Sequence, residues 1–325
     1  MKIAVIGTNF ITDRFLEAAR LHPVFSLAAV CASSMEKAES FAARHGSAPA
    51  YDDYRELVKL PELDGVYLAT PNPLHHEMTL FFLEAGIPVL CEKPLAPTLR
   101  QADEMIALSA RKNTLLLEGM FPLYTLNFRA IRESLWQLGK VRKANLSYCQ
   151  YSSRYDSYRR GVVQNAFRLE KMGGSLLDIG IYPLYQAIAL FGKPDRVSAT
   201  AQLLDTGIDG SGTVVLSYPG FDAVVSHSKV SNTTLGSELQ GEDGCLMYTG
   251  GSDPLTVVLT PRGGQPQDLA RPEPPQKMFY EVEEFIRCIK MGLTQSPLVP
   301  HSLALEVYAL TDEIRRQTGV KFTIE

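Results

Sequence analysis

Cysteine is scarce in this sequence, and its spacing matches neither a disulfide framework nor a redox motif. The 325 residues include five cysteines, an odd number, and no two of them stand in C-x-x-C spacing. Scattered single thiols of this kind are typical of proteins in a reducing compartment. We therefore expect free cysteines and a cytoplasmic location.

Metal-ligand and hydrolase patterns are also missing from the sequence. The six histidines lack H-x-x-x-H and H-E-x-x-H spacing, and no G-x-S-x-G turn follows a predicted strand. Zinc sites need clustered ligands, and α/β hydrolases need a nucleophile at such a turn. The sequence thus predicts no metal site and no hydrolase triad.

The chain has no surplus of basic charge and no long hydrophobic run. It carries 32 Lys and Arg residues against 36 Asp and Glu residues, a formal net charge of -4. The apolar stretch 78–83 ends at Glu84 and is too short to span a bilayer. A strand-like segment begins at Lys2, so we expect no signal peptide. These absences predict a protein that binds neither nucleic acid nor a membrane.

The first third of the chain alternates short apolar runs with helical patterns. Strands are predicted over 2–6, 26–32, 65–69, 89–91 and 114–118, and helices over 10–20, 35–45, 54–59, 73–85 and 99–112. This β-α-β-α order with short turns is typical of a doubly wound parallel sheet. We predict an α/β protein in which residues 1–122 form a Rossmann domain.

The pattern changes after Met120. The segment 141–151 alternates apolar and polar residues, and strands follow over 197–204, 213–218, 223–229, 237–241, 244–249 and 255–260, with helices over 127–138, 279–291 and 302–318. Short strands joined by glycine-containing turns are typical of antiparallel sheets. Residues 123–325 are therefore predicted to form an α+β domain with a large open, mostly antiparallel sheet.

A possible phosphate-binding turn follows the first strand and reads Gly7-Thr8-Asn9-Phe10-Ile11-Thr12. The G-x-G-x-x-G fingerprint lets the backbone approach a pyrophosphate closely, and only its first glycine is present here. Asn9 tolerates a positive φ, so we expect it to replace the second glycine. A helix starting near Phe10 would point its N-terminus at the pyrophosphate. The turn predicts a dinucleotide site at residues 7–11, with a turn that binds nothing as the alternative.

The second strand ends without an acidic residue, in Cys31-Ala32-Ser33-Ser34. An NAD enzyme usually carries Asp or Glu here to bind the ribose 2′-hydroxyl. Its absence removes the repulsion against a 2′-phosphate, and Ser33, Ser34 and Lys37 offer hydrogen bonds. No arginine is present, so the cofactor is predicted to be NADP or NAD, with NADP favoured. The alternative for the serines is a turn and a helix cap.

Three further motifs lie after predicted strands or early in the second domain. They read Thr70-Pro71-Asn72-Pro73-Leu74-His75, Glu92-Lys93-Pro94 and Gly173-Gly174-Ser175-Leu176-Leu177-Asp178-Ile179-Gly180-Ile181-Tyr182-Pro183. In combination they resemble the Gfo/Idh/MocA oxidoreductases over nearly the whole chain. The branch most similar contains glucose–fructose oxidoreductase, dimeric dihydrodiol dehydrogenases and aldose 1-dehydrogenases. The segments 118–122 and 280–289 also resemble that branch.

The chemistry of a hydride transfer fits these positions. Ligands of an open α/β sheet bind outside the carboxyl ends of its strands, where Thr70, Asn72, His75, Glu92 and Lys93 should gather near the nicotinamide. Oxidation of an alcohol also needs a group that takes its proton. The charge of Lys93 beside the reacting oxygen can lower the pKa of a nearby tyrosine from about 10.

The resemblance assigns that proton transfer to Tyr182. Asp178 lies four residues earlier, on the same face if the segment is helical, and would orient the substrate or the tyrosine. Arg168 matches a position from which the family contacts the cofactor, although Phe167 replaces the usual tryptophan. The alternatives are a core position for Tyr182, a helix cap for Asp178 and a surface ion pair for Arg168.

The sequence as a whole predicts an NAD(P)-dependent oxidoreductase for a small, sugar-like or cyclic polyhydroxy substrate. One alternative is an apolar-substrate reductase of the dihydrodiol type, with Phe121, Phe279 and Tyr280 lining its pocket. Another is a non-catalytic regulator of the same fold that binds a nicotinamide nucleotide. The resemblance also implies that the open sheet pairs with a second copy, as a homodimer or a dimer of dimers.

Overall fold

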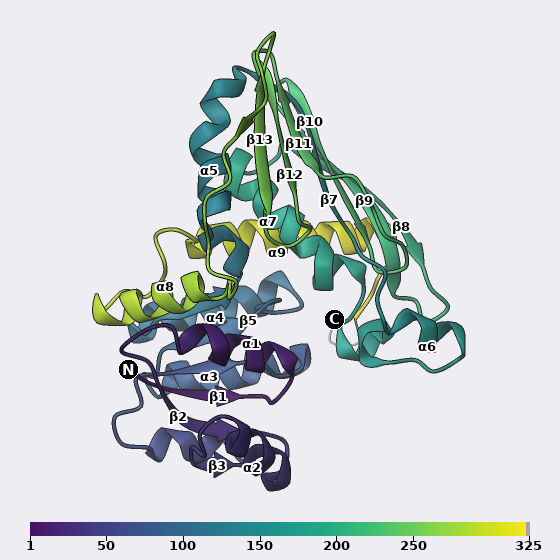
Figure 1. The fold of residues 1–325 in the computed structure, drawn as a ribbon. Coiled ribbons are helices and arrows are strands. Elements are labelled where there is room, and N and C mark those ends of the chain that lie inside the picture. The colour runs from purple at the N-terminus through teal and green to yellow at the C-terminus, as the bar shows by residue number, and fades with distance from the viewer. Residues whose placement is uncertain (323–325) are drawn as a thin grey trace. The chain divides into compact units, whose positions relative to one another are not determined.

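The computed structural model describes residues 1–322, which form two compact units (Figure 1). The first unit comprises Met1–Tyr124 and Pro274–His301, and the second comprises Thr125–Glu273 and the chain from Ser302 onward. The predicted boundary after residue 122 lies close to the first of these breaks. The structure differs in returning residues 274–301 to the first unit.

The sheet of the first unit has six parallel strands in the order β3-β2-β1-β4-β5-β6. The strands are β1 (Lys2–Ile6), β2 (Ser26–Cys31), β3 (Ala50–Tyr51), β4 (Gly65–Leu68), β5 (Val89–Glu92) and β6 (Leu116–Gly119). All residues of β4, β5 and β6 are buried, as expected for parallel strands covered on both faces. The strand order reverses between β1 and β4, and ligands of such sheets bind at that switch point.

Helices on both sides of this sheet complete the first unit. They are α1 (Phe10–Ala19), α2 (Met35–Arg44), α3 (His75–Glu84), α4 (Leu99–Lys112) and α8 (Phe279–Lys290), with the shorter 3₁₀ helices η1 (Tyr54–Lys59), η2 (Asn72–Leu74) and η3 (Phe121–Tyr124). One apolar cluster joins α1, α2 and α8 to the central strands, and within it Phe15 stacks on Tyr67 with 3.8 Å between ring centroids. Helix α8 thus supplies part of the first unit's core from far along the chain.

The second unit contains an eight-stranded sheet in the order β14-β13-β12-β11-β7-β10-β9-β8. Its strands are β7 (Val141–Cys149), β8 (Arg196–Leu203), β9 (Asp209–Tyr218), β10 (Phe221–Ser228), β11 (Ser237–Gly241), β12 (Gly244–Thr249), β13 (Thr256–Pro261) and β14 (Gln267–Asp268). Neighbouring strands are antiparallel except for the parallel pair β7 and β10. The sheet is therefore mostly antiparallel, as the sequence predicts.

The helices of the second unit are α5 (Leu126–Ser134), α6 (Tyr155–Arg159), α7 (Ile181–Phe191) and α9 (His301–Thr318), with the short η4 (Leu135–Leu138), η5 (Asn165–Phe167), η6 (Leu169–Lys171) and the π-helical η7 (Leu176–Gly180). The single helix predicted over 127–138 consists of α5 and η4. By length and composition alone, Leu169–Phe191 could cross a membrane, but 78% of its apolar window is buried within the fold. The α7 portion contacts β7 and β10, so this segment is a core element.

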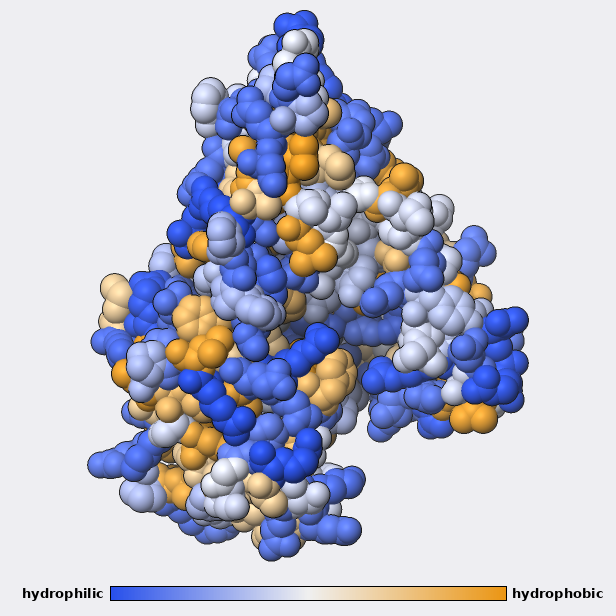
Figure 2. Space-filling view, in the orientation of Figure 1, coloured by the Kyte–Doolittle hydropathy of each residue, from blue (hydrophilic) through white to orange (hydrophobic). Residues whose placement is uncertain are grey.

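Hydrophobic residues on the visible face are scattered in small patches among hydrophilic ones (Figure 2). Several large apolar side chains are nevertheless exposed on the second unit, including Leu203, Met247 and Leu255 on or beside the strands of its sheet. Isolated exposed apolar residues are normal, whereas larger patches mark interaction sites.

The core of the first unit contains a carboxyl group without a hydrogen-bond partner. Glu281 in α8 is fully buried, and among the described residues neither of its carboxyl oxygens is hydrogen-bonded. Burial, and secondarily the charge of Glu92, raise the pKa of Glu281 well above its usual value. A group whose pKa is higher in the folded state than in the unfolded state loses its stabilising contribution as the pH rises.

Replacing this acid by an apolar side chain of similar length should stabilise the protein. We expect Glu281→Met to raise the free energy of unfolding by about 1–3 kcal/mol, because it removes a buried polar group that lacks a partner. The gain should be larger at pH 8 than at pH 5, since the unfolded chain releases this proton above a pH of about 4.3. Thermal unfolding of both proteins at the two pH values measures it.

Glu283→Met is the matched control, because Glu283 lies on the same helix and is exposed. It should leave the melting temperature nearly unchanged at both pH values. A destabilised Glu281→Met variant, or an equal gain at both pH values, would show that the buried acid is not an electrostatic liability.

Candidate functional site

The turn between β1 and α1 brings the backbone unusually close to the end of β4. Gly7 has a φ of 106°, and a Cβ built on it would lie 2.2 Å from the carbonyl oxygen of Ala69. Its amide donates a 2.9 Å hydrogen bond to the carbonyl of Cys31. Only glycine fits here, and the resulting close-packed turn at the carboxyl edge of the sheet can cradle a phosphate group.

Asn9 takes a different part in this turn from the one the sequence predicts. Its φ is -93°, so the expected positive φ is wrong. Its side-chain oxygen instead accepts a 2.9 Å hydrogen bond from the Ile11 amide, and its Nδ2 donates to the Ala69 carbonyl at 2.8 Å. Asn9 therefore caps α1 and ties the turn to β4. Thr8 and Ile11 are half-buried beside it, and Phe10 is exposed.

The segment after β2 combines a helix cap with a cation. The Ser34 side chain accepts a 3.4 Å hydrogen bond from the Lys37 amide and caps α2, as the structural alternative proposed. The Lys37 ammonium group donates to the Ser33 hydroxyl at 3.2 Å. Both Ser33 and Lys37 are exposed, so a hydroxyl and a positive charge lie together where an anion can reach them.

The loop after β5, which carries Lys93, is held by its neighbours. The Tyr67 hydroxyl donates a 2.6 Å hydrogen bond to Glu92, and the Leu95 amide donates to Glu118 at 3.1 Å. A Cβ on Gly119 would lie 3.2 Å from the Cα of Glu92, so β6 packs closely against this loop. Lys93 itself is half-buried. These contacts fix the backbone from which its ammonium group projects.

Glu92 is an unusual carboxyl group because it is buried beside that lysine. Burial raises its pKa to about 6, while the Tyr67 hydroxyl and the Lys93 charge partly offset the effect. Glu92 is thus a weaker acid than an exposed glutamate. Its hydrogen bond with Tyr67 ties the start of the loop to β4.

His75 links this loop to the one after β4. Its ring is buried, and its two nitrogens lie 2.8 Å from the carbonyl oxygens of Pro94 and Thr70. Burial lowers its pKa although both carbonyls favour the protonated ring, and in the neutral form the ring donates to only one of the two. His75 therefore bridges two loops from inside the fold, whereas Asn72 and Thr70 are half-buried at the strand end.

In the second unit, the double glycine at 173–174 admits a buried carboxylate. Gly174 has a φ of 100°, and a Cβ on it would lie 2.2 Å from Oδ1 of Asp209. Asp209 accepts a 2.6 Å hydrogen bond from the Leu176 amide at the start of η7. Burial raises the pKa of Asp209 to about 7. The glycine motif thus lets an acid from β9 cap the helix that carries Asp178.

A buried histidine supports the same helix from β10. His227 Nδ1 lies 2.9 Å from the Ser175 hydroxyl, and a Cβ on Gly180 would lie 2.9 Å from the His227 ring. Burial lowers the pKa of His227 to about 4, so the ring is neutral near pH 7. Ser175 and Gly180 of the motif are explained by this packing.

Asp178 and Tyr182 belong to consecutive helices of different pitch. Asp178 lies in the π-helical η7 and Tyr182 in the first turn of α7, so the α-helical spacing expected between them is not present. π-Helical turns are rare and occur frequently at functional sites. Asp178 forms an ion pair with Lys229, and the Tyr182 ring lies 5.8 Å from that of Tyr148.

Arg168 lies at the surface of the second unit. Its Nε donates a 3.0 Å hydrogen bond to the Val163 carbonyl, and its guanidinium group lies 3.5 Å from Glu170. The neighbouring Phe167 is fully buried against Tyr155 and Tyr158. Arg168 thus has the surface ion pair that the sequence raised as an alternative.

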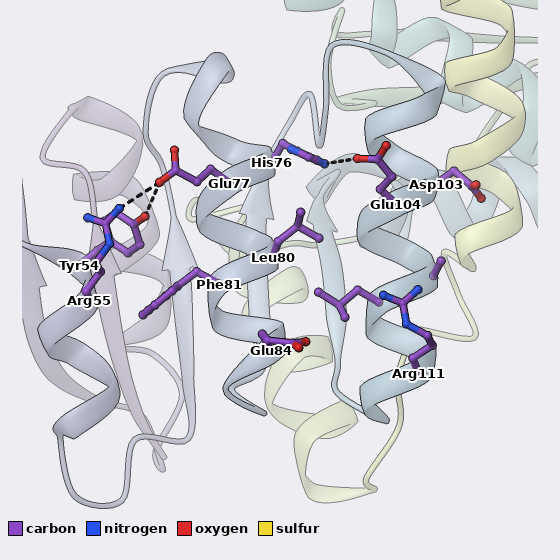
Figure 3. A pocket seen from close by; sticks show the side chains of 12 residues that line it. Tyr54, Arg55, His76, Glu77, Leu80, Phe81, Glu84, Asp103, Glu104 and Arg111 are labelled. Atoms are coloured by element: carbon purple, nitrogen blue, oxygen red, sulfur yellow. Dashed lines mark hydrogen bonds and ion pairs between the residues drawn. The ribbon is translucent and has the colours of Figure 1, made fainter.

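A cavity of about 840 Å³ opens on the helical side of the first unit (Figure 3). Its lining comes from η1, α3 and α4 and includes two sets of paired polar side chains. Glu77 accepts hydrogen bonds from Tyr54 at 2.7 Å and Arg55 at 3.1 Å, and His76 lies 2.7 Å from Glu104. Apart from Arg168, the predicted cofactor residues lie instead at or after the carboxyl ends of β1, β2, β4 and β5.

The structure groups the predicted residues by unit. In the first unit, residues 7–11, Thr70, Asn72, His75, Glu92 and Lys93 follow the adjacent strands β1, β4 and β5. Four supporting residues were not predicted: Tyr67, Asp209, His227 and Lys229. The one usable signal was the alternation of β10, which puts His227 in phase with the buried Ala223 and Val225.

Comparison with known proteins shows the family of this chain. Residues 1–120 match the family model of the oxidoreductase family with an NAD-binding Rossmann fold, and residues 128–247 match that of the GFO/IDH/MocA C-terminal domain. The chain is 42% identical to scyllo-inositol 2-dehydrogenase (NADP(+)) IolU of Bacillus subtilis, over 99% of this chain and 98% of that protein. It is 30% identical to trans-1,2-dihydrobenzene-1,2-diol dehydrogenase of Oryctolagus cuniculus, over 98% of each chain.

Among solved structures, KijD10, a 3-ketoreductase from Actinomadura kijaniata in complex with NADP and TDP-benzene, has the same fold. Its TM-score is 0.86 at 23% identity, and the alignment covers 98% of each chain. The two family models together match residues 1–120 and 128–247. The chain belongs to the GFO/IDH/MocA family and is an NAD(P)-dependent oxidoreductase that acts on CH–OH groups.

Proposed function

We propose that this enzyme is a dehydrogenase of cyclic polyols that prefers NADP, with Lys93 and Tyr182 in acid/base roles. The observation that carries the proposal is the loop of Lys93, tied to β4, β6 and α3 through Glu92, Glu118 and His75. Such bracing is what a charge aimed at a reacting oxygen requires, because catalytic groups must be held in a defined position.

The cofactor would be held by backbone and side chains of the first unit. The Gly7 turn and the N-terminus of α1 suit a pyrophosphate, and Thr70 and Asn72 lie after the neighbouring strand. Ser33 and Lys37 suit a ribose 2′-phosphate, since one supplies a hydroxyl and the other a positive charge. Nicotinamide supplies the hydride acceptor or donor. Arg168 is a weaker candidate for a cofactor contact, because Val163 and Glu170 already engage its side chain.

Three side chains are assigned separate parts in the proposed reaction. Lys93 stabilises negative charge on the substrate oxygen, and Tyr182 takes or returns the proton. Asp178 accepts hydrogen bonds from substrate hydroxyl groups, which suits a polyol because it offers several donors.

The substrate class follows from the relatives and from the polar character of this segment. The 42% identical relative is named as a scyllo-inositol dehydrogenase, and the 30% identical one as a dihydrodiol dehydrogenase. Asp178 and its lysine partner favour a substrate rich in hydroxyl groups over the apolar one. We also propose a cytoplasmic location, which suits five free cysteines that form no disulfide.

Removing the charge of Lys93 should abolish turnover while cofactor binding persists. We expect Lys93→Met to lower kcat for scyllo-inositol oxidation by at least about a hundredfold, because the developing charge on oxygen loses its partner. Kinetic assays with NADP⁺ measure turnover, and a fluorescence titration with NADPH measures binding. Lys59→Met, an exposed lysine of the same unit, is the control. Full activity of Lys93→Met would remove Lys93 from the reaction.

A negative charge after β2 should reverse the cofactor preference. Ser33→Asp is expected to weaken NADPH binding by at least about tenfold, since the carboxylate repels a 2′-phosphate and Lys37 is drawn to it. NADH binding should be retained or improved. Ser40→Asp, on the exposed face of α2, controls for added charge. Equal effects of both substitutions on NADPH would mean that Ser33 does not face the 2′ position.

The second unit's open sheet is proposed to pair with another copy of the chain. Light scattering after size exclusion should give at least twice the chain mass of 35.9 kDa at micromolar concentration. Met247→Lys, on the exposed side of β12, should shift the protein toward monomer because it places a charge in an apolar contact. A wild-type monomer would contradict the proposed pairing.

A further inference from the structure

We infer that Lys229 is a positioning residue of the reaction: it holds the Asp178 carboxylate ionised and in one orientation, so that Asp178 binds substrate hydroxyls while Tyr182 exchanges the proton. The inference rests on the proposed function, because it assigns Asp178 a specific part in it. The observation is the ion pair between Lys229 and Asp178.

The pair joins two elements of the second unit that lie far apart in sequence. Asp178 projects from η7, and Lys229 follows the last residue of β10. The backbone of Lys229 is fixed on both sides, since its amide donates to the Gly210 carbonyl and its carbonyl accepts from the Ser152 amide, each at 2.9 Å. These two backbone hydrogen bonds therefore fix the position from which the Lys229 side chain projects.

The two ends of the pair differ in exposure. The Lys229 side chain is 5% exposed, whereas that of Asp178 is 37% exposed. The ammonium group lies 5.9 Å from the ring of the buried Phe167, an arrangement that favours a cation over an aromatic face. The charge is thus supplied from inside the fold, and the carboxylate is presented toward the surface.

A buried positive charge has two consequences for the carboxylate. It favours the ionised form, because attraction between opposite charges is stronger where water is excluded. It also makes Asp178 a weaker base, because protonation would neutralise the carboxylate and remove its attraction to the Lys229 ammonium group. Asp178 is then suited to accept hydrogen bonds from substrate hydroxyl groups, and it is not suited to take the proton of the hydroxyl group that is oxidised. This leaves proton exchange to Tyr182, one helical segment further along.

A surface ion pair in the same unit shows the contrast. Lys193 lies 3.4 Å from Glu306, and its side chain is 72% exposed. Solvent screens such a pair, so it fixes neither partner in place. Lys193→Met is therefore the matched control. It removes a lysine from an exposed ion pair of the same unit, so it tests whether the loss of any such pair changes the kinetics.

The experiment compares steady-state kinetics of four variants over a panel of cyclic polyols and aldoses with NADP⁺. The variants are Lys229→Met, Lys229→Arg, Asp178→Asn and the double variant Lys229→Met/Asp178→Asn. Thermal melts establish that each is folded, and NADPH titration establishes that the first unit is intact. The polyol with the highest kcat/KM for the wild-type enzyme is used throughout.

We expect Lys229→Met to lower kcat/KM for the polyol at least about tenfold, with a rise in its KM and no change in NADPH affinity. Lys229→Arg should recover most of this loss, because arginine keeps the charge. The double variant should be no worse than Asp178→Asn alone, since the lysine acts through the aspartate. Lys193→Met should match the wild type.

Two results would overturn the inference. One is a Lys229→Met variant with wild-type kcat/KM, and the other is a double variant whose loss is the product of the two single losses. Failure of the proposed function looks different: Lys93→Met and Asp178→Asn would both keep full turnover, or no polyol or aldose would be oxidised by the wild-type enzyme. In that case the part assigned to Lys229 falls with it.

Discussion

The hydrogen bond from the Leu176 amide to the buried carboxylate of Asp209 is the interaction on which the segment carrying Asp178 and Tyr182 depends. It can form only because Gly174 has no side chain where Asp209 approaches. The helix that begins there carries Asp178 and then Tyr182. The glycines and the serine of this motif are therefore largely required for packing, and the two side chains proposed to be catalytic project from a backbone that this packing holds in place.

The first unit solves the same problem with different residues. Glu92 receives the Tyr67 hydroxyl, Glu118 receives the Leu95 amide, and His75 spans two loops, so Lys93 projects from a backbone held on several sides. Both braces use buried acids whose pKa values are raised, to about 6 for Glu92 and about 7 for Asp209. Burying an acid costs free energy. Here each buried acid helps to fix the backbone that carries a nearby charged side chain, Lys93 in the first unit and Asp178 in the second.

Most helices and strands of the two units could be predicted from the sequence, because they depend on local residue patterns. Strand and helix periodicity gave the parallel sheet, the later antiparallel one and helix α4 at its observed bounds, Leu99–Lys112. The features that the sequence did not predict depend on contacts between residues far apart along the chain. The prediction for Asn9 used only its tolerance of a positive φ. In the structure its side chain caps α1 through the Ile11 amide and donates to the distant Ala69 carbonyl. Helix α8 was assigned by chain order to the second domain, yet its apolar face completes the core of the first.

Lys229 shows why such partners cannot be read from one sequence. A lysine at the end of a predicted strand usually faces water. The alternation of β10 puts Lys229 in phase with the buried His227, but nothing local identifies its partner. Its environment is created by Phe167 and by the register that sets β10 beside β7 and β9. A charge that is costly in isolation becomes tolerable only beside a carboxylate. The pairing with Asp178 therefore decides where both charges can reside, and it is the reason that we assign proton exchange to Tyr182 and not to Asp178.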